Sequence, residues 1–215
     1  MVAYITMIYP DTKLEERLWS EGYNLVLGLD EAGRGPLAGP VVAGGVVITK
    51  ESEIIPTVRD SKKMTGKQRN EAFEKIKESV LAYGVGIVSA SEIDRIGIQK
   101  AVLKAMITVL EVVEGKLNER INYIIADGPN ILSIPRYKMD KIKKGDLYHY
   151  SISAGSVLAK VTRDRIMREY HERYPQYGFD TNVGYGTKEH IEAIKKFGIT
   201  KIHRKSFSPI NDHFS

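Results

Sequence analysis

The chain alternates along most of its length between short apolar runs and longer segments with helical periodicity. The runs have the length and β-branched content of buried strands, whereas the segments between them repeat apolar residues every three or four positions. Strands that alternate with helices build α/β domains, in which helices cover a sheet. The runs lie at residues 25–29, 41–48, 84–89 and 123–126, with a shorter fifth run at 136–139. We therefore expect an α/β fold with four or five strands.

Capping and turn signals mark where these elements begin and end. Thr65 and Gln68 have the spacing of a capping box at a helix start. The first two strands are joined by a short loop with three glycines and two prolines, which predicts an antiparallel pair. The other signals are Asp11 as a first cap, Ser91 opening a helix broken near Gly97, a long helix over 151–173, and a last helix from Thr187 to Gly198.

Length and composition limit the class of protein. A chain of 215 residues fits one domain and can bury a substantial core. It has no cysteine, which excludes disulfides, thiolate metal sites and a cysteine nucleophile. No apolar run reaches the roughly 20 residues that span a bilayer, and the acidic residues among the first 19 argue against a signal peptide. We expect a cytoplasmic protein that does not enter a membrane.

Positive charge is concentrated in the second half of the chain. Residues 136–205 hold 16 Lys and Arg against 8 Asp and Glu, a surplus of +8, whereas the whole chain carries +5. A basic half indicates a polyanionic partner such as a nucleic acid. A solvated basic surface that only maintains solubility explains the charge equally well, so both readings stay open here.

Four carboxylates occupy equivalent positions in the expected elements. Asp30 and Glu31 end the first strand, Asp127 ends the fourth, and Asp146 precedes the long helix. Such carboxylates, if they converge, repel one another unless hard cations such as Mg²⁺ or Mn²⁺ neutralise them. Two ions in such a site can activate water and stabilise the leaving oxygen of a phosphodiester. Each acid alone is more often a cap or a turn residue, so the pattern indicates a metal-dependent phosphoryl enzyme only as one possibility.

Several short motifs in a fixed order make the chain similar to the type 2 ribonuclease H family, and within it to ribonuclease HII. They span about residues 24–209. In chain order they are DEAGRG at 30–35, DSK at 60–62, DG at 127–128, KGD at 144–146, SISAGSVLAKVTRDR at 151–165, GYGT at 184–187 with His190, and HRKSF at 203–207.

The resemblance implies a ribonuclease H-like mixed five-stranded sheet flanked by helices, with a small C-terminal helical portion. It implies a single catalytic domain over 1–215, with a core at about 24–175 and a substrate-binding portion at about 176–215. The four carboxylates would hold two Mg²⁺ or Mn²⁺ ions, with Asp30 bridging both. The expected partners are RNA/DNA hybrids and DNA duplexes that contain ribonucleotides, cut 5′ of a ribonucleotide to leave a 3′-hydroxyl and a 5′-phosphate. A monomer with a role in ribonucleotide excision repair is expected.

The family motifs also suggest how RNA would be distinguished from DNA, which requires reading the 2′-hydroxyl. The Gly33-Arg34-Gly35 backbone can approach a sugar closely, and by resemblance Tyr185 would bond the 2′-hydroxyl. A plain tight turn is the alternative for the glycine loop. Candidate phosphate contacts are Lys62, Lys160, Arg163 and Lys188, and Ser61 is a further candidate substrate-binding residue. For Lys160, a local ion pair with Asp164 is an equal alternative.

Three features depart from the family or lack a clear role. Val183 stands where a lysine is usual, which predicts a weaker phosphate contact unless Lys188 supplies it. Gly155 stands where alanine is usual, and we expect this to cost little beyond helix propensity. For His190 and His203 we expect a structural or phosphate-contacting role rather than general-acid catalysis. The competing functions are a catalytically silent hybrid-binding protein of the same fold and another ribonuclease H-like nuclease.

Overall fold

The structure is a computed structural model that describes residues 8–213. The sequence prediction that no signal peptide is present rests partly on residues 1–7, which lie outside the described residues. None of the helices in the described part of the chain combines the length and the apolar character needed to cross a membrane.

The centre of the molecule is a mixed five-stranded sheet of order β3-β2-β1-β4-β5. The antiparallel pairs are β1 with β2 and β2 with β3, whereas β1, β4 and β5 are parallel. This confirms the predicted mixed sheet and the predicted antiparallel hairpin of the first two strands. The strands are β1 (Val26–Ala32), β2 (Val41–Val47), β3 (Ala82–Val88), β4 (Tyr123–Asp127) and β5 (Met139–Ile142).

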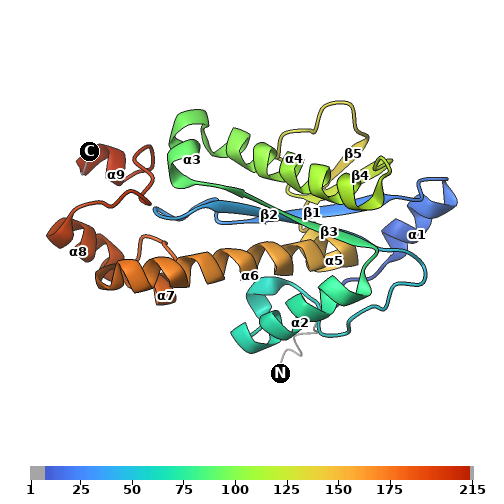
Figure 1. Cartoon of the computed structure of the whole chain (residues 1–215), viewed down its shortest axis with the longest axis horizontal. Coiled ribbons are helices and arrows are strands. Elements are labelled where there is room, and N and C mark those ends of the chain that lie inside the picture. The colour runs from blue at the N-terminus through green and yellow to red at the C-terminus, as the bar shows by residue number, and fades with distance from the viewer. Residues whose placement is uncertain (1–7, 214–215) are drawn as a thin grey trace, which may run out of the picture.

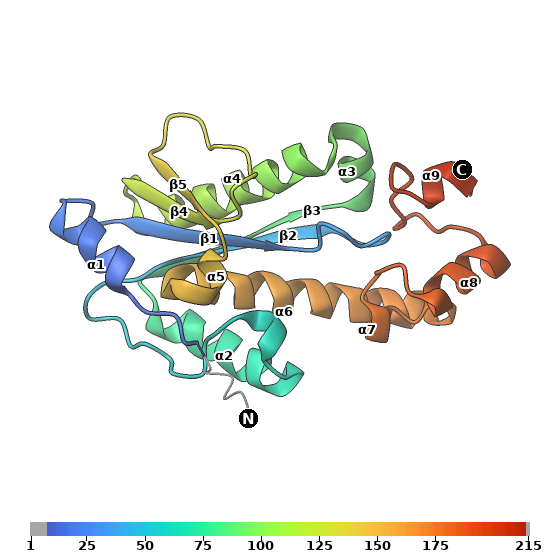
Figure 2. The same ribbon diagram turned by 180° about the vertical axis from the view of Figure 1, so that it is seen from behind.

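Helices cover both faces of this sheet (Figures 1 and 2). One face is covered by α4 and the other by α6, with α2 packed on the far side of α6. The short C-terminal helices lie together at the end of the molecule opposite α1. The helices are α1 (Lys13–Ser20), α2 (Gly66–Ser79), α3 (Ala90–Ile96), α4 (Ile98–Leu117), α5 (Gly145–Tyr148), α6 (Tyr150–Arg173), α7 (Phe179–Asn182), α8 (Lys188–Phe197) and α9 (Ile210–His213), with 3₁₀ turns at Ser61–Lys63 and Pro175–Tyr177.

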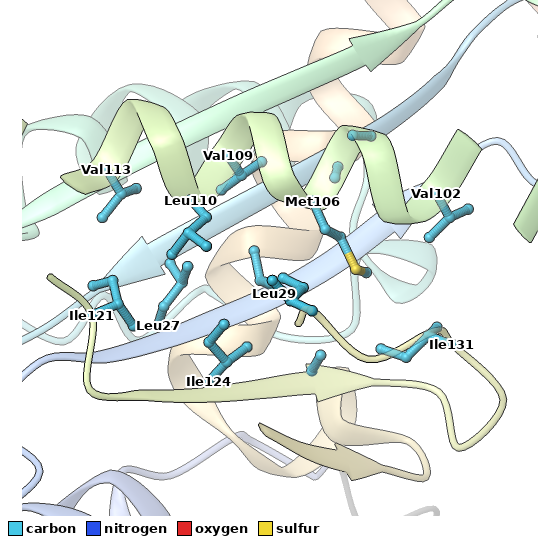
Figure 3. Close-up of a cluster of buried hydrophobic side chains, with 14 of the residues drawn as sticks. Leu27, Leu29, Val102, Met106, Val109, Leu110, Val113, Ile121, Ile124 and Ile131 are labelled. Atoms are coloured by element: carbon cyan, nitrogen blue, oxygen red, sulfur yellow. The ribbon is translucent and has the colours of Figure 1, made fainter. Parts of the chain in front are cut away.

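The main hydrophobic core lies between α4 and the sheet (Figure 3). Apolar residues recur on α4 at a spacing of three or four, so one side of this helix is continuously apolar. That side packs on Leu27 and Leu29 of β1 and on Ile124 of β4. The buried α4 residues in this cluster are Val102, Met106, Val109, Leu110 and Val113, together with Ala101 and Ala105.

The opposite face depends on close backbone contact between α6 and the sheet. A Cβ built on Gly44 of β2 would lie 2.3 Å from the Gly155 carbonyl oxygen, and one on Gly155 would lie 2.8 Å from the Gly44 oxygen. Gly44 also pairs with Asp30 across the β1–β2 register. Gly155 therefore matters through its missing Cβ as well as through helix propensity, because the missing Cβ lets α6 approach the strands.

Several predicted boundaries shift. β1 continues through Asp30 and Glu31 to Ala32, because Ala32 still pairs with Val42. β5 begins at Met139 and not at 136, since Arg136 has a φ of 68°, which is incompatible with an extended strand.

The helix starts shift in the same way. Asp146 precedes the long helix α6, as predicted, and lies inside a short helix, α5, that the sequence does not predict. Ser89 and not Ser91 caps α3, because the Ser89 side chain accepts the N–H of Glu92. Thr12 and not Asp11 is the N-cap residue of α1. The capping box of Thr65 with Gln68 and the cap of α8 by Thr187 are confirmed.

Candidate functional site

The carboxylates converge because of how β1, β4 and α5 are arranged. β1 and β4 are neighbouring parallel strands, so their carboxyl ends, with Asp30 and Asp127, lie at the same edge of the sheet. α5 follows β5 at this edge, and the Gly145 N–H donates to Asp127 Oδ1 over 2.6 Å. One oxygen from each of Asp30, Asp127 and Asp146 lies within 4.8 Å of the others. The structure thus brings three of the four predicted acids into one cluster.

Burial and mutual repulsion disfavour the charged forms of these acids. Asp30 is only 5% exposed. Its burial, followed by the charges of Glu31 and Asp127, raises its pKa well above the usual value. Burial also raises the pKa of Asp127, with the charge of Asp146 adding to the effect. A bound cation would offset both the cost of burying the charged carboxylates and their mutual repulsion.

Glu31 lies beside this cluster and faces the glycine loop. Its Oε1 accepts a hydrogen bond from Arg34 Nη1 over 3.2 Å, whereas its Oε2 is buried with no hydrogen-bond partner. Burial raises the pKa of Glu31 despite the opposing effect of Arg34. The donor set is made only of oxygens, is crowded and contains an unpartnered buried oxygen, and these properties fit hard divalent cations.

A cavity of about 530 Å³ opens beside the carboxylates. It brings together eight of the nine predicted substrate-binding residues and leaves out Lys188, whose exposed side chain pairs with Glu192 over 3.9 Å. Sequence reasoning missed Arg69 and Ser156, which also line it. The predicted residues that line the cavity are Gly33, Arg34, Gly35, Ser61, Lys62, Lys160, Arg163 and Tyr185, together with Asp30, Glu31 and Asp127.

The lysines of this cavity are paired with acids. Lys62 Nζ lies 3.5 Å from Asp146 Oδ2, and its side chain is largely exposed. Lys160 Nζ lies 2.7 Å from Asp164 Oδ1, so the local ion pair considered from the sequence does form. Since both lysines line the cavity, they remain candidates for phosphate contact.

Two buried arginines hold the loop that contains Gly33 and Gly35. Arg163 is 1% exposed and donates to the carbonyls of Pro40 and Ala38 over 3.0 and 3.1 Å. Arg163 therefore supports this loop, and because it also lines the cavity, its predicted phosphate contact stays a prediction. Gly33 has a φ of 95°, and a Cβ there would lie 2.2 Å from Arg163 Nε, so only glycine fits. The loop is thus a tight turn that buried hydrogen bonds hold in place.

Arg204 supports the same loop from the C-terminal part of the chain. It is fully buried and donates to the carbonyls of Gly39, Arg34 and Gly33 over 3.0, 2.9 and 2.6 Å. Burial, with the nearby charge of Arg163, lowers the pKa of Arg204 to about 9. The sequence contained Arg204 in a family motif, but nothing in its spacing indicated this role.

His190 and His203 form a buried pair below Tyr185. Their Nε2 atoms lie 3.1 Å apart, His190 Nδ1 lies 2.8 Å from the Tyr185 carbonyl oxygen, and the Thr200 N–H donates to His203 Nδ1 over 2.9 Å. The two side chains are 0% and 2% exposed, and neither lines the cavity. This placement agrees with the structural role expected from the sequence.

Acidification is expected to destabilise the protein through His203. Burial, followed by the proximity of His190, lowers the pKa of His203 to about 4. A base with a depressed folded-state pKa stabilises the fold above its unfolded pKa of about 6.5, and this stabilisation is lost as the pH falls toward 4. The shift corresponds to about 3 kcal/mol at most. Urea titrations at pH 7 and pH 4.5 will measure the loss, and His203→Phe should lose less; an equal loss in both proteins would contradict the assignment.

Val183, at the position of the family's usual lysine, has a strained backbone. Its φ of 42° lies in the left-handed region, which a β-branched residue rarely adopts. The next residue, Gly184, has a φ of 85°, and its N–H donates to Asn182 Oδ1 over 2.7 Å. Tyr185 directly follows this turn, lines the cavity and is half exposed.

Comparisons with known proteins show the family of the chain. A family model described as Ribonuclease HII matches residues 27–210. A Ribonuclease HII of Caldanaerobacter subterraneus subsp. tengcongensis is 51% identical over 90% of this chain and 78% of its own length. One of Bacillus velezensis is 48% identical over 92% of this chain and 75% of its own. The crystal structure of the ribonuclease H2 from Pyrococcus horikoshii has a TM-score of 0.72 and 26% identity, covering 87% of this chain and 96% of that one. Similarity of this extent, on a shared fold, means that the chain belongs to the ribonuclease HII family and is an endonuclease of the ribonuclease H type.

Proposed function

We propose that the protein cuts the RNA strand of RNA/DNA hybrids, and the 5′ side of ribonucleotides embedded in duplex DNA, with two Mg²⁺ or Mn²⁺ ions held by Asp30, Glu31, Asp127 and Asp146. The observation that carries this proposal is the carboxylate cluster, with oxygens within 4.8 Å, next to a cavity lined by the glycine loop and Tyr185. When bound, such ions supply positive charge to an attacking water and to the leaving oxygen of the phosphodiester.

The chain's own residues bind and orient the substrate. Asp30 and Asp127 are fixed by their strands, and the Asp30 carboxylate accepts the Glu31 N–H over 2.7 Å. The Gly33 and Gly35 backbone lies where a sugar and its phosphate can approach closely. Arg34, which is partly exposed and bonded to Glu31, offers a charged group to a phosphate from the rim of the site. The products would be a 3′-hydroxyl and a 5′-phosphate.

Tyr185 is proposed to read the 2′-hydroxyl. It is 49% exposed, although it lines the cavity. A Cβ built on Gly35 would be in ordinary van der Waals contact with its ring, at 3.7 Å. The ring and the loop therefore lie next to each other on the wall of one cavity, which suits recognition of a single sugar. In this proposal the C-terminal portion, 176–215, supplies Tyr185 and so contributes to substrate binding.

The decisive experiment uses a labelled DNA duplex with one ribonucleotide, incubated with the protein in Mg²⁺ and then in Mn²⁺. An all-DNA duplex, a long RNA/DNA hybrid and an Asp146→Asn variant are run beside it. Cleavage just 5′ of the ribonucleotide, absent in the all-DNA duplex and in the variant, is expected. Tight binding without cleavage of either substrate would instead support a silent hybrid-binding protein. Equal cleavage of the all-DNA duplex would indicate a general nuclease.

Replacing Tyr185 should separate its hydroxyl from its ring. Tyr185→Phe removes one hydrogen bond and is expected to lower kcat/KM on the ribonucleotide duplex by about 10-fold, corresponding to about 1.4 kcal/mol. Tyr185→Ala removes the ring as well and is expected to cost about 100-fold. Steady-state kinetics on the single-ribonucleotide duplex measure both. Wild-type kinetics in Tyr185→Ala would remove this residue from the recognition site.

The other expectations from the sequence stay predictions. Analytical ultracentrifugation tests the monomeric state, and the location of a tagged chain in cells tests the cytoplasmic assignment. A role in ribonucleotide excision repair predicts that cells lacking the protein accumulate ribonucleotides in their DNA.

A further inference from the structure

His203 and Arg204 are neighbours in the chain, yet each is bonded to a different side of the proposed sugar site. The Arg204 guanidinium donates to the carbonyls of Gly33 and Arg34 in the glycine loop. His203 reaches the other side, since its Nε2 lies 3.1 Å from His190 Nε2 and His190 bonds the Tyr185 carbonyl. Neither His203 nor Arg204 lines the cavity.

The hydrogen bonds fix the protonation of both histidines. The Thr200 N–H can only donate, so His203 Nδ1 is an acceptor and the proton is on Nε2. That Nε2–H donates to His190 Nε2, which must therefore be unprotonated. The remaining proton of His190 is on Nδ1 and donates to the carbonyl oxygen of Tyr185. The three hydrogen bonds therefore run in one direction, from Thr200 through His203 and His190 to Tyr185, and we call this chain of hydrogen bonds the relay.

Backbone hydrogen bonds join the two sides into one unit. The N–H groups of Leu37 and Ala38 donate to the Gly184 carbonyl over 2.8 and 3.2 Å. The Arg204 N–H donates to the Leu37 carbonyl over 2.8 Å, and the Gly39 N–H donates to the Ile202 carbonyl over 2.8 Å. The segment around residues 202–204 therefore contacts the glycine loop directly and the Tyr185 turn through His190.

We propose that His203 and Arg204 are positioning residues that set the distance between the glycine loop and Tyr185, and that selectivity for a ribonucleotide depends on this distance. The proposal rests on the proposed function, since it assumes that these two elements together read one ribose. A buried, fully bonded dipeptide is suited to this task because it has few alternative conformations. The two residues act through Gly33, Arg34 and Tyr185 and do not touch the substrate.

The first test needs no variant. Nitrogen chemical shifts of selectively labelled histidines report which ring nitrogen carries the proton. We expect His203 protonated on Nε2 and His190 on Nδ1, both neutral at pH 7.5. The opposite arrangement, or a charged imidazolium on either residue, would overturn the relay.

The second test is a double-mutant cycle between His203→Phe and Tyr185→Ala. The readout is the ratio of Kd for an all-DNA duplex to Kd for the same duplex with one ribonucleotide, measured in Ca²⁺ to limit cleavage. His203→Phe is expected to lower this ratio about 5-fold in the wild-type background and by less than about 1.5-fold when Tyr185 is already alanine. Equal effects in both backgrounds, or no effect in either, would overturn the proposal.

Control variants separate positioning from loss of stability. Ile202→Ala truncates a buried neighbour in the same cluster without removing a relay atom, so it should lower Tm and leave the Kd ratio unchanged. His203→Gln keeps a donor toward His190 and should restore at least half of the lost ratio. Because the ratio is a binding measurement, a protein that discriminates but does not cleave would contradict the proposed catalytic function and leave the positioning result intact.

Discussion

Asp30→Asn is expected to reduce cleavage of a single-ribonucleotide duplex by about 1,000-fold or more. Asp30 lies deepest in the carboxylate cluster, at 5% exposure, and its oxygens are close to Asp127 and Asp146. An amide offers one neutral oxygen in place of two charged ones, so cation binding at the centre of the proposed site is lost. The loss of a single well-placed electrostatic group already costs about 100- to 1,000-fold in other enzymes.

The same substitution is expected to stabilise the metal-free protein. The pKa of Asp30 is raised in the fold by burial and by Glu31 and Asp127, so its ionised form is unfavourable there. A carboxyl with a raised folded-state pKa contributes its full stability below the unfolded value of about 3.9, and the contribution is lost as the pH rises through the folded value. In EDTA the wild type should therefore lose stability relative to Asp30→Asn as the pH rises from 4 to 8.

The control for both effects is Asp140→Asn on β5, which makes the same change of charge outside the carboxylate cluster. It should leave cleavage within about twofold of wild type and should not raise the metal-free Tm. Thermal melts with and without Mg²⁺ complete the test. An Asp30→Asn variant that cleaves normally would remove Asp30 from the site, and one that is less stable in EDTA would contradict the electrostatic argument.

Gly44→Ala is expected to destabilise the protein by about 3 kcal/mol or more. The added methyl group would lie 2.3 Å from the Gly155 carbonyl oxygen and 2.8 Å from the Ala159 nitrogen, both backbone atoms of α6. Neither can move without shifting the helix from the sheet. For a chain of this size, such a loss lowers Tm by about 10 °C. Because Gly44 pairs with Asp30, activity measured well below Tm should fall as well.

Gly115→Ala provides the matched control. This glycine lies in α4, and a Cβ there meets nothing within 4 Å. Alanine should therefore stabilise the protein by about 0.5–1 kcal/mol through helix propensity alone. Urea titrations of both variants measure the difference, and similar effects of the two substitutions would show that the close contact between β2 and α6 is unimportant.

Local sequence signals predicted most of the architecture. The Thr65 capping box, the break at Gly97 and the Thr187 cap are all present, because each depends on residues within one turn of one another. The sequence predicts β5 three residues too early, since the extent of this strand is set by parallel pairing with β4 and not by its own composition. Asp146 does precede the long helix α6, as predicted, but the helix α5 that contains it is too short to produce a periodic pattern.

The sequence predicts the carboxylates of the candidate site, but it does not predict the arginines that hold the glycine loop beside them. Acids at strand ends stand out in a sequence, whereas the roles of Arg163 and Arg204 depend on backbone carbonyls that lie more than 120 residues away. A sequence also cannot show whether a basic side chain faces a phosphate or the protein's own backbone. For Arg163 the sequence therefore indicates a phosphate contact without its bonds to the loop carbonyls, and for Arg204 it indicates no role.

The hydrogen bonds from Arg204 to the glycine loop can form only late in the synthesis of the chain. Arg204 bonds carbonyls that precede it by 165 to 171 residues. A ribosome adds about 5–20 residues per second, so the loop leaves the exit tunnel on the order of ten seconds before the arginine that holds it. Through that interval the nascent chain can fold its early strands and expose its acids, but it lacks the arrangement proposed to select a ribonucleotide. Under the proposed function, the groups that select a ribonucleotide are complete only after Arg204 has been made, so a chain stalled before residue 204 would carry the acids without the discrimination.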